Sequence, residues 1–257
     1  MQDLKDVAAI VTGGASGLGA ATATRLSARG AKVALFDINE DAGSEHAISI
    51  GGVFAKVDVT NEAEVVAAMD DAERLHGPAR ILINCAGVAP RVNMIRYRDT
   101  PHPLDLYRHV LEVNLVASFC TATQFTARLF NKDLPDEERG VIINTASIAA
   151  FDGQAGHAAY AASKGGLVSM TLPLARDLAQ YKIRVMTIAP GLFDTPMLGD
   201  VPNPKEFSLG SQVPHPRRLG DPDEFARLVE HIVTNSMLNG EVIRLDGAFR
   251  MLPDRQA

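Results

Sequence analysis

Short apolar runs rich in β-branched residues recur along the chain, and helix-length segments rich in Ala, Leu and Arg separate them. Runs of this kind predict buried strands, and the segments between them predict helices. Strands that alternate with helices form right-handed β-α-β units, so they pair in parallel and carry helices on both faces. The predicted fold class is therefore α/β, with one doubly wound sheet of about seven strands. The runs are Val7 to Val11, Lys32 to Phe36, Val53 to Val57, Ile81 to Ile83, Val141 to Asn144, Arg184 to Ile188 and Glu241 to Leu245.

Turn residues agree with this periodicity. Gly30 and the pair Gly77-Pro78 stand where helices should end, as glycine commonly does. No repeat or interdomain linker interrupts the pattern, so we expect residues 1–257 to form a single domain. Segments 92–104 and 131–140 break the rhythm and are predicted surface insertions. Segment 192–218 is rich in proline and carries apolar side chains, which predicts a lid over a site.

A glycine-rich stretch follows the first predicted strand and leads into a helix. It reads Thr12-Gly13-Gly14-Ala15-Ser16-Gly17-Leu18-Gly19. Such a turn lets backbone N–H groups and a helix N-terminus approach a pyrophosphate, with Ser16 and Leu18 at the point of approach. Spaced glycines are weak evidence in isolation, but the strand–turn–helix context is the one that a dinucleotide site requires.

Asp37 ends the second predicted strand, eighteen residues after Gly19. A carboxylate at this place accepts hydrogen bonds from an adenosine ribose. Neither Ile38, Asn39 nor Glu40 offers a cation to offset a 2′-phosphate, so the pattern favours NAD over NADP. The alternative is that Asp37 only caps the turn that follows it.

Two further strand ends add residues to the same edge of the sheet. They are Asp58-Val59 after the third strand and Asn84-Cys85-Ala86-Gly87 after the fourth. Open α/β sheets bind ligands at the carboxyl ends of their strands. The small residues there leave space for an adenine and a ribose, so both stretches are candidate cofactor-binding segments.

The acid/base candidates are Ser147, Tyr160 and Lys164. Tyr160 and Lys164 are four residues apart and share one helix face, which places the ammonium near the phenol. A nearby cation favours the phenolate, so we expect it to lower the tyrosine pKa from about 10. Ser147 follows a strand and is expected to hydrogen-bond the oxygen that Tyr160 protonates. The trio predicts chemistry on an alcohol or a ketone, although Tyr-x-x-x-Lys by itself arises by chance in many helices.

Composition narrows the function further. Hydrophobic residues make up 46% and charged residues 22%, as in soluble globular proteins. The net charge of −6, with no run of Lys and Arg, argues against nucleic-acid binding, and no stretch is long enough to cross a membrane. Cys85 and Cys120 are too few for a disulfide framework and too far apart for a metal-ligand pair, so we expect no metal site and a reducing, cytoplasmic location. The first predicted strand begins near Val7, so we expect no targeting segment before it.

These motifs together resemble the classical short-chain dehydrogenase/reductase family over the full chain. The shared features are Thr-Gly-x-x-x-Gly-x-Gly, Asn-x-Ala-Gly, Asn114, Ser147, Tyr160-x-x-x-Lys164 and Pro190-Gly191, in this order. From about Arg139 onward the chain is similar to the type II 3-hydroxyacyl-CoA dehydrogenases, a group also known as 17β-hydroxysteroid dehydrogenase type 10. Segments 139–147, 188–193 and 238–248 carry that similarity.

The resemblance implies a single Rossmann domain with NAD as cofactor, a 3-hydroxyacyl-CoA substrate and a homotetramer, located in the mitochondrial matrix if the source is a eukaryote. It implies that Asn114 holds a proton-relay water through its backbone, beside catalytic Ser147, Tyr160 and Lys164. Gln154 joins Ser147 and Tyr160 as a substrate residue. The implied cofactor-binding residues are Gly13, Ser16, Gly17, Leu18, Gly19, Asp37, Asp58, Val59, Asn84, Cys85, Ala86, Gly87, Tyr160, Lys164, Pro190, Phe193 and Thr195.

Several alternatives concern the substrate. His157 stands where the family usually has glutamine, and it is either a substrate neighbour or a solvated residue at a helix start. Arg91, Arg96 and Arg98 either bind coenzyme A phosphates or are solvated loop charges. A steroid or another secondary alcohol remains a competing substrate. A scaffold subunit of an RNA-processing assembly is a competing class of function, although an intact trio favours catalysis.

Overall fold

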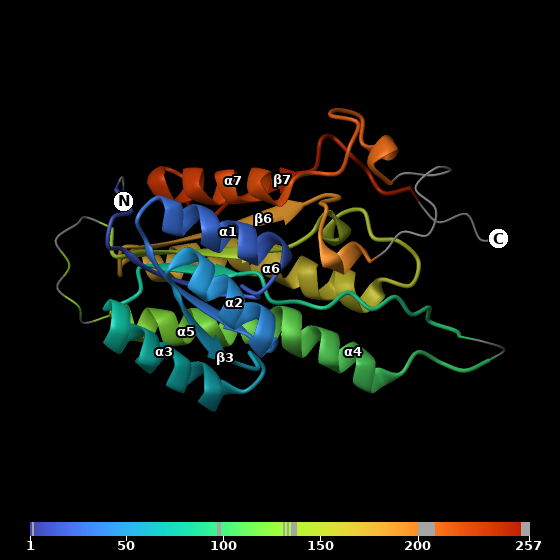
Figure 1. Cartoon of the computed structure of the whole chain (residues 1–257). Helices are drawn as coiled ribbons and strands as arrows, with labels where there is room; N and C mark the ends of the chain where they lie inside the picture. The colour runs from blue at the N-terminus through green and yellow to red at the C-terminus, as the bar shows by residue number, and fades with distance from the viewer. Residues whose placement is uncertain are drawn as a thin grey trace.

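Parallel strands build one sheet in the computed structural model, which describes residues 1, 3–96, 99–130, 132, 134, 138–199 and 209–252. The sheet has seven strands in the order β3-β2-β1-β4-β5-β6-β7 (Figure 1). Each predicted run is confirmed, with ends that differ by at most two residues. The strands are β1 (Ala8–Thr12), β2 (Lys32–Asp37), β3 (Val53–Lys56), β4 (Ile81–Asn84), β5 (Gly140–Thr145), β6 (Ile183–Pro190) and β7 (Val242–Leu245).

Helices cover both faces because the strand side chains alternate between two buried clusters. Ala9 and Val11 of β1 face a cluster that α1, α2 and α7 complete, whereas Ile10 faces one that α3, α5 and α6 complete. The chain thus forms the doubly wound α/β sheet that its pattern predicts. The helices are α1 (Gly17–Ala28), α2 (Glu40–Ile50), α3 (Glu62–His76), α4 (Leu104–Leu111), α5 (Ala117–Leu129), α6 (Ala158–Ala179) and α7 (Pro222–Thr234).

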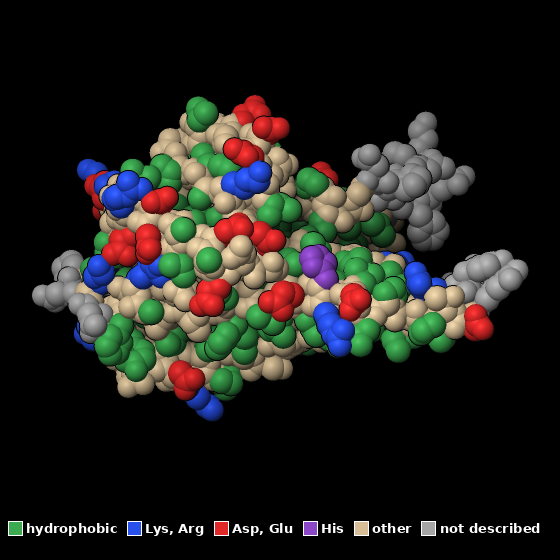
Figure 2. Space-filling model, turned by 90° about the horizontal axis from the view of Figure 1, so that it is seen from below, with side chains coloured by type: hydrophobic (Ala, Val, Ile, Leu, Met, Phe, Trp, Pro, Cys, Tyr) green, Lys and Arg blue, Asp and Glu red, His purple; other side chains and the backbone are tan. Residues whose placement is uncertain are grey.

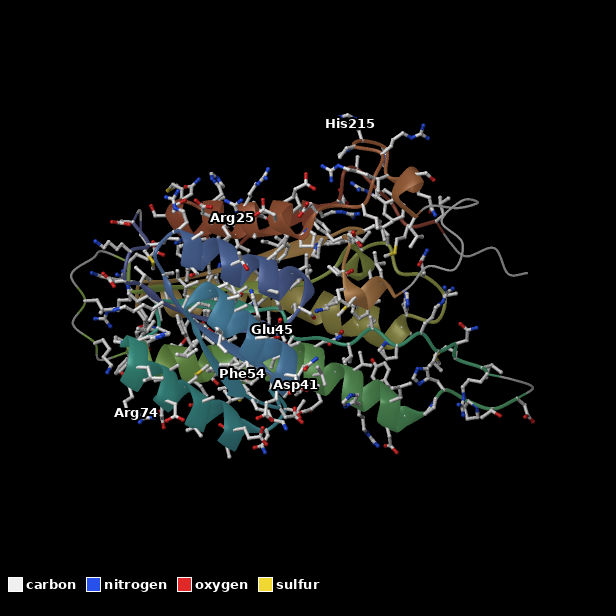
Figure 3. All side chains as sticks on the ribbon, viewed as in Figure 1. Arg25, Asp41, Glu45, Phe54, Arg74 and His215 are labelled. Carbon is white, nitrogen blue, oxygen red and sulfur yellow. The ribbon has the colours of Figure 1, made fainter. Side chains whose placement is uncertain are left out.

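Ion pairs connect α1, the helix that follows the glycine-rich turn, to α7. Arg25 of α1 points toward α7 (Figure 3), where its guanidinium bonds Asp223 at 2.7 Å and Glu230 at 2.8 Å. Asp221 caps α7 in a reciprocal capping box with Glu224. These contacts hold α1, and with it the turn before it, in one position on the sheet.

Gly43 allows α2 to lie close to the sheet. A Cβ at this position would meet the Phe54 ring of β3 at 2.1 Å, so only glycine lets the helix approach. Phe54 belongs to β3 and is labelled near α2 in Figure 3. This close packing fixes the distance between α2 and the sheet.

Parallel pairing brings the carboxyl ends of the central strands to one edge. Thr12, Asp37, Asn84 and Thr145 are the last residues of β1, β2, β4 and β5. The connections that follow them gather at the right-hand end of the molecule in Figure 1. This edge is where open α/β sheets bind ligands, and it holds most of the candidate residues.

The structure describes parts of the two predicted insertions and of the predicted lid. Residues 92–96 and 99–103 project from the body (Figure 1), with an antiparallel bridge between Ile95 and Pro101 and an exposed Met94. Arg98 lies outside the described residues, as do 131, 133 and 135–137 of the second insertion. The predicted lid is described at 192–199 and 209–218, with short 3-10 turns at Pro196–Leu198 and Leu209–Gln212, and its remaining residues lie outside the described part. Among the described residues, no helix is long and apolar enough to span a membrane.

Candidate active site

The glycine-rich turn is compact because its glycines touch other backbone. A Cβ on Gly19 would lie 2.1 Å from the Gly13 carbonyl oxygen, and one on Gly13 would lie 2.7 Å from the Ala86 nitrogen. Gly17, with φ of 54°, begins α1, and Ser16 precedes it without a side-chain cap. The helix N-terminus and the Ser16 hydroxyl thus fit a pyrophosphate, and Leu18 packs on the nearby core.

Both oxygens of the Asp37 carboxylate accept backbone hydrogen bonds. Oδ2 accepts from Ala15 N at 3.0 Å, and Oδ1 accepts from Asn39 N at 2.9 Å. The second bond is the turn cap of the alternative interpretation, while the first ties the carboxylate to the glycine-rich turn. Asp37 therefore caps the turn and also has a fixed orientation at the sheet edge, which suits a ribose acceptor.

Thr12 connects this turn to the end of β4. Its hydroxyl oxygen accepts hydrogen bonds from the backbone nitrogens of Cys85 and Ala86, both at 3.2 Å. Burial raises the pKa of the Cys85 thiol to about 11, which argues against thiolate chemistry and leaves the backbone and small size of Cys85 as its features suited to a cofactor. Sequence reasoning left Thr12 out of the site, although its place in the glycine motif was a usable signal.

Three other cofactor candidates have side chains that are buried or hydrogen-bonded within the protein. Val59 is buried in the core. Asp58 accepts from the Thr60 nitrogen and hydroxyl, and these bonds lower its pKa. Asn84 donates to Asn144 at 2.9 Å inside the molecule. The structure thus places the Asn84 side chain behind the edge, bracing β4 against β5.

The acid/base trio converges where β5 ends. Ser147 follows the strand, and Tyr160 and Lys164 extend from α6, with the Lys164 nitrogen 5.7 Å from the centre of the Tyr160 ring. Lys164 is buried and donates to the Thr145 carbonyl at 2.7 Å. The Ser147 hydroxyl accepts from Ala149 N at 3.1 Å. The Thr145 carbonyl is a partner that the sequence did not single out.

The expected direction of the Tyr160 pKa is wrong for this structure. Burial raises the pKa of Tyr160, and the hydrogen bond with Ser147 opposes that rise without overcoming it. Burial also lowers the pKa of Lys164 to about 8, so the cation that was to stabilise the phenolate is itself destabilised. Sequence spacing could not reveal this, because it gives proximity and not the loss of solvent.

Asn114 lies in a π-helical turn, Glu112–Val116, between α4 and α5. Its side chain accepts from Val88 N at 2.8 Å and donates to the Val88 carbonyl at 2.9 Å. It also donates to Ser163 on α6 at 3.0 Å. A Cβ on Gly87 would lie 3.1 Å from the side-chain oxygen Oδ1 of Asn114 and 3.5 Å from the Lys164 side-chain nitrogen, so Gly87 packs closely beside the trio.

The candidates after β6 are divided between core and site. Pro190 ends the strand, and the Phe193 ring is buried against Phe225 of α7 with centroids 6.4 Å apart. Only the backbone of Phe193 is thus suited to a cofactor contact. Thr195, in contrast, lies 3.4 Å from the place of a Gly17 Cβ, so it meets the glycine-rich turn.

Gln154 and His157, two candidates for substrate contact, have different surroundings. Gln154 donates to the Leu252 carbonyl at 3.1 Å, which ties it to the C-terminal segment. His157 is half-buried, and its ring lies 6.0 Å from the Tyr160 ring. Burial first, and the nearby Arg91 charge second, lower the His157 pKa. His157 is therefore a neighbour of the trio and not a fully solvated helix-start residue.

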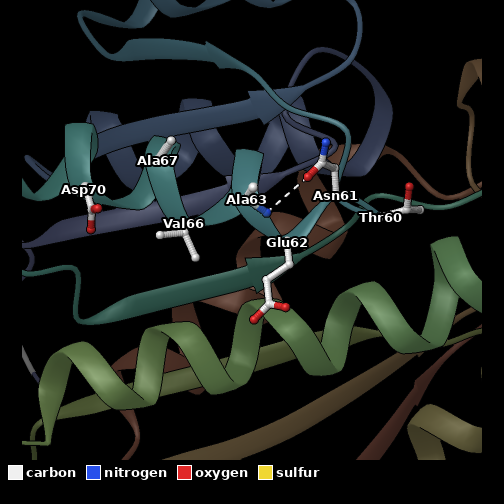
Figure 4. A pocket seen from close by; sticks show the side chains of 7 residues that line it. All are labelled: Thr60, Asn61, Glu62, Ala63, Val66, Ala67 and Asp70. Atoms are coloured by element: carbon white, nitrogen blue, oxygen red, sulfur yellow. Dashed lines mark hydrogen bonds between the residues drawn. The ribbon is translucent and has the colours of Figure 1, made fainter.

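A surface depression of 830 Å³ lies elsewhere, along α3 where it faces α5 (Figure 4). Asn61, which caps α3, and Asp70 stand at its two ends, and Ala63, Val66 and Ala67 line it between them. These are helix-surface side chains, remote in sequence from the trio. The acid/base geometry, and not the size of this depression, identifies the candidate active site.

Comparison with known proteins agrees with that geometry. The short chain dehydrogenase family model matches residues 7–206. The chain is 50% identical to 3-hydroxyacyl-CoA dehydrogenase type-2 of Homo sapiens, with 98% of each chain covered. It is 48% identical to the Drosophila melanogaster protein of the same name, with 97% of this chain and all of the other covered. The crystal structure of 3-hydroxyacyl-CoA dehydrogenase type-2 from Mycobacterium avium superposes with a TM-score of 0.91 at 35% identity, covering 99% of this chain and 100% of that one. The chain is an oxidoreductase that belongs to the short-chain dehydrogenase family.

Proposed function

We propose that the protein oxidises a 3-hydroxyacyl-CoA to the 3-oxoacyl-CoA, reversibly and with NAD. The observation that carries the proposal is the convergence of Ser147, Tyr160 and Lys164 at the end of β5, beside Gly87. The names of the relatives that match nearly the whole chain support the substrate class. The scaffold alternative has no comparable observation in its favour.

Tyr160 is the acid/base group of the proposed reaction. In the oxidation direction its phenolate takes the hydroxyl proton, while the carbinol hydrogen leaves with its electron pair. Ser147 hydrogen-bonds the substrate oxygen and steadies its developing charge. NAD, when bound, supplies the hydride acceptor.

Lys164 and Asn114 assist this proton transfer. Lys164 donates to the Thr145 carbonyl and lies near the Tyr160 ring, so its positive charge favours the phenolate against the burial that raises the Tyr160 pKa, and it holds a cofactor ribose. In the proposal the backbone at Asn114 holds a water that passes the proton onward; its carbonyl lies in the π-helical turn and accepts from the Ser118 hydroxyl at 3.1 Å. The Asn114 side chain keeps this turn against Val88 and Ser163.

Asp37 supports the choice of NAD. Its carboxylate is fixed by two backbone donors and has no cation among the next three residues. It is arranged to accept from ribose hydroxyls and to repel a 2′-phosphate. The Gly13, Ser16, Gly17, Leu18 and Gly19 turn supplies the pyrophosphate site.

A substrate panel tests the proposal. With NAD, we expect short or branched 3-hydroxyacyl-CoAs to have the highest kcat/KM, well above steroid alcohols. A higher value for a steroid or another simple secondary alcohol would replace the acyl-CoA assignment and keep the dehydrogenase chemistry. No turnover of any alcohol by folded protein that binds NADH would favour the scaffold alternative.

A homotetramer in the cytoplasm, or in a eukaryote the mitochondrial matrix, completes the proposal. Figure 2 views the face that α3, α4 and α5 form, where apolar side chains lie among charged ones. Val116, Phe119 and Phe130 are exposed in this region, and β7 leaves one sheet edge open. Surfaces of this kind suit association with identical chains.

A further inference from the structure

A histidine on α2 reaches the glycine-rich turn. His46 Nδ1 lies 2.9 Å from the Gly14 carbonyl oxygen, and Nε2 lies 3.0 Å from the Thr24 hydroxyl on α1. A carbonyl only accepts, so the ring carries its proton on Nδ1, and when the ring is neutral Nε2 accepts from Thr24. The imidazole thus spans from α2 to both the turn and the helix that follows it.

The peptide that His46 holds is the one that Asp37 holds from its other side. The Gly14 carbonyl and the Ala15 N–H belong to one planar peptide unit. The carbonyl accepts from His46, and the N–H donates to Asp37 Oδ2 at 3.0 Å. Rotation of this peptide would break both bonds together and leave the Asp37 carboxylate with the bond from Asn39 N, so His46 helps to fix the orientation of that carboxylate.

Packing of α2 delivers the imidazole to this place. Gly43, one turn earlier, brings the helix against Phe54, and Ala47 is buried beside it. His46 itself is half-buried, whereas the neighbouring Glu45 is exposed (Figure 3). The side chain is thus held at a defined distance from the turn and is not a mobile surface group.

We propose that His46 is a positioning residue for the cofactor. It fixes the peptide between Gly14 and Ala15, and through that peptide it fixes the Asp37 carboxylate that receives the adenosine ribose. The inference rests on the proposed use of this turn and Asp37 for NAD. It adds a residue outside the glycine motif that sets cofactor affinity without touching the reacting atoms.

The test compares His46→Leu with His46→Asn. Leucine removes the donor, while asparagine places an amide N–H at the position of Nδ1, the same number of bonds from the backbone. We expect His46→Leu to raise the Kd for NADH about three- to tenfold, the worth of one hydrogen bond, with kcat at saturating NAD within about twofold of the unsubstituted protein. His46→Asn should restore the Kd to within about twofold.

Controls and a direct spectroscopic readout complete the experiment. Glu45→Gln on the same helix and Thr24→Val, which removes only the Nε2 partner, should leave the Kd within about twofold, since each retains the bond to Gly14. Nitrogen-15 spectra of the cofactor-free protein should show the Nδ1–H form of His46. If His46→Leu does not fold, His46→Ala takes its place.

Three results would overturn the inference: an unchanged Kd in folded His46→Leu, an Asn variant as weak as the Leu variant, or an Nε2–H ring. A loss confined to thermal stability would likewise reduce His46 to a structural role. Failure of the unsubstituted protein to bind NADH is a different outcome, because it would contradict the proposed function itself.

Discussion

Replacing Lys164 with Met should stabilise the fold while removing activity. The buried ammonium has a pKa of about 8, against an ordinary value of 10.5 in the unfolded chain. Each pKa unit corresponds to about 1.4 kcal/mol, so at pH 7 the charge costs the folded state roughly 3 kcal/mol. The lost hydrogen bond to the Thr145 carbonyl offsets about 1 kcal/mol of the gain. Methionine has a similar length, so we expect a net gain of about 2 kcal/mol.

The pH dependence gives this prediction an internal check. Because the folded pKa is lowered, the unfolded chain binds more protons between about pH 8 and 10.5, so the cost of the lysine fades as pH rises through that window. The advantage of Lys164→Met should therefore shrink by about 2 kcal/mol between pH 7 and 9.5. Urea unfolding followed by circular dichroism measures both values. A variant that is less stable at pH 7, or whose advantage does not depend on pH, would refute the reasoning.

Three further predictions concern cofactor choice, coenzyme A and assembly. NAD should be preferred over NADP by at least about tenfold in kcat/KM, and Asp37→Ser should reduce that ratio by a similar factor; equal values in the unsubstituted protein would contradict it. Joint removal of Arg96 and Arg98 should raise KM for an acyl-CoA, most strongly at low salt, and spare a substrate without phosphate; an equal effect on both substrates would return these arginines to the solvated surface. Light scattering at micromolar concentration should show a homotetramer, with Ile243 to Met251 at a contact, and a monomer would refute this.

The fold was predictable because its signals are local and repeated. Each apolar run and each glycine stop constrains one strand or helix, and parallel pairing then brings Thr12, Asp37 and Thr145 to one edge without further information. The spacing of Tyr160 and Lys164 was equally informative, since one helix carries both.

What the sequence could not reveal depends on burial and on contacts between distant segments. Spacing placed a cation near Tyr160, but burial decides that the tyrosine pKa rises and the lysine pKa falls. Asn84 belongs to a motif at the cofactor edge, yet its amide bonds Asn144 in the interior. His46 gave no signal, because its contact with Gly14 joins residues 32 positions apart and depends on how closely α2 packs.

The substitution Tyr160→Phe tests the central claim most directly. It removes the one oxygen that is proposed to exchange a proton with the substrate and leaves the buried ring in place. NADH binding by fluorescence titration and turnover of a 3-hydroxyacyl-CoA should be measured on the same folded protein. We predict that turnover falls by at least about a thousandfold while the Kd for NADH stays within about threefold. Near-normal turnover would show that another group performs the acid/base step and would contradict the proposed role of the trio.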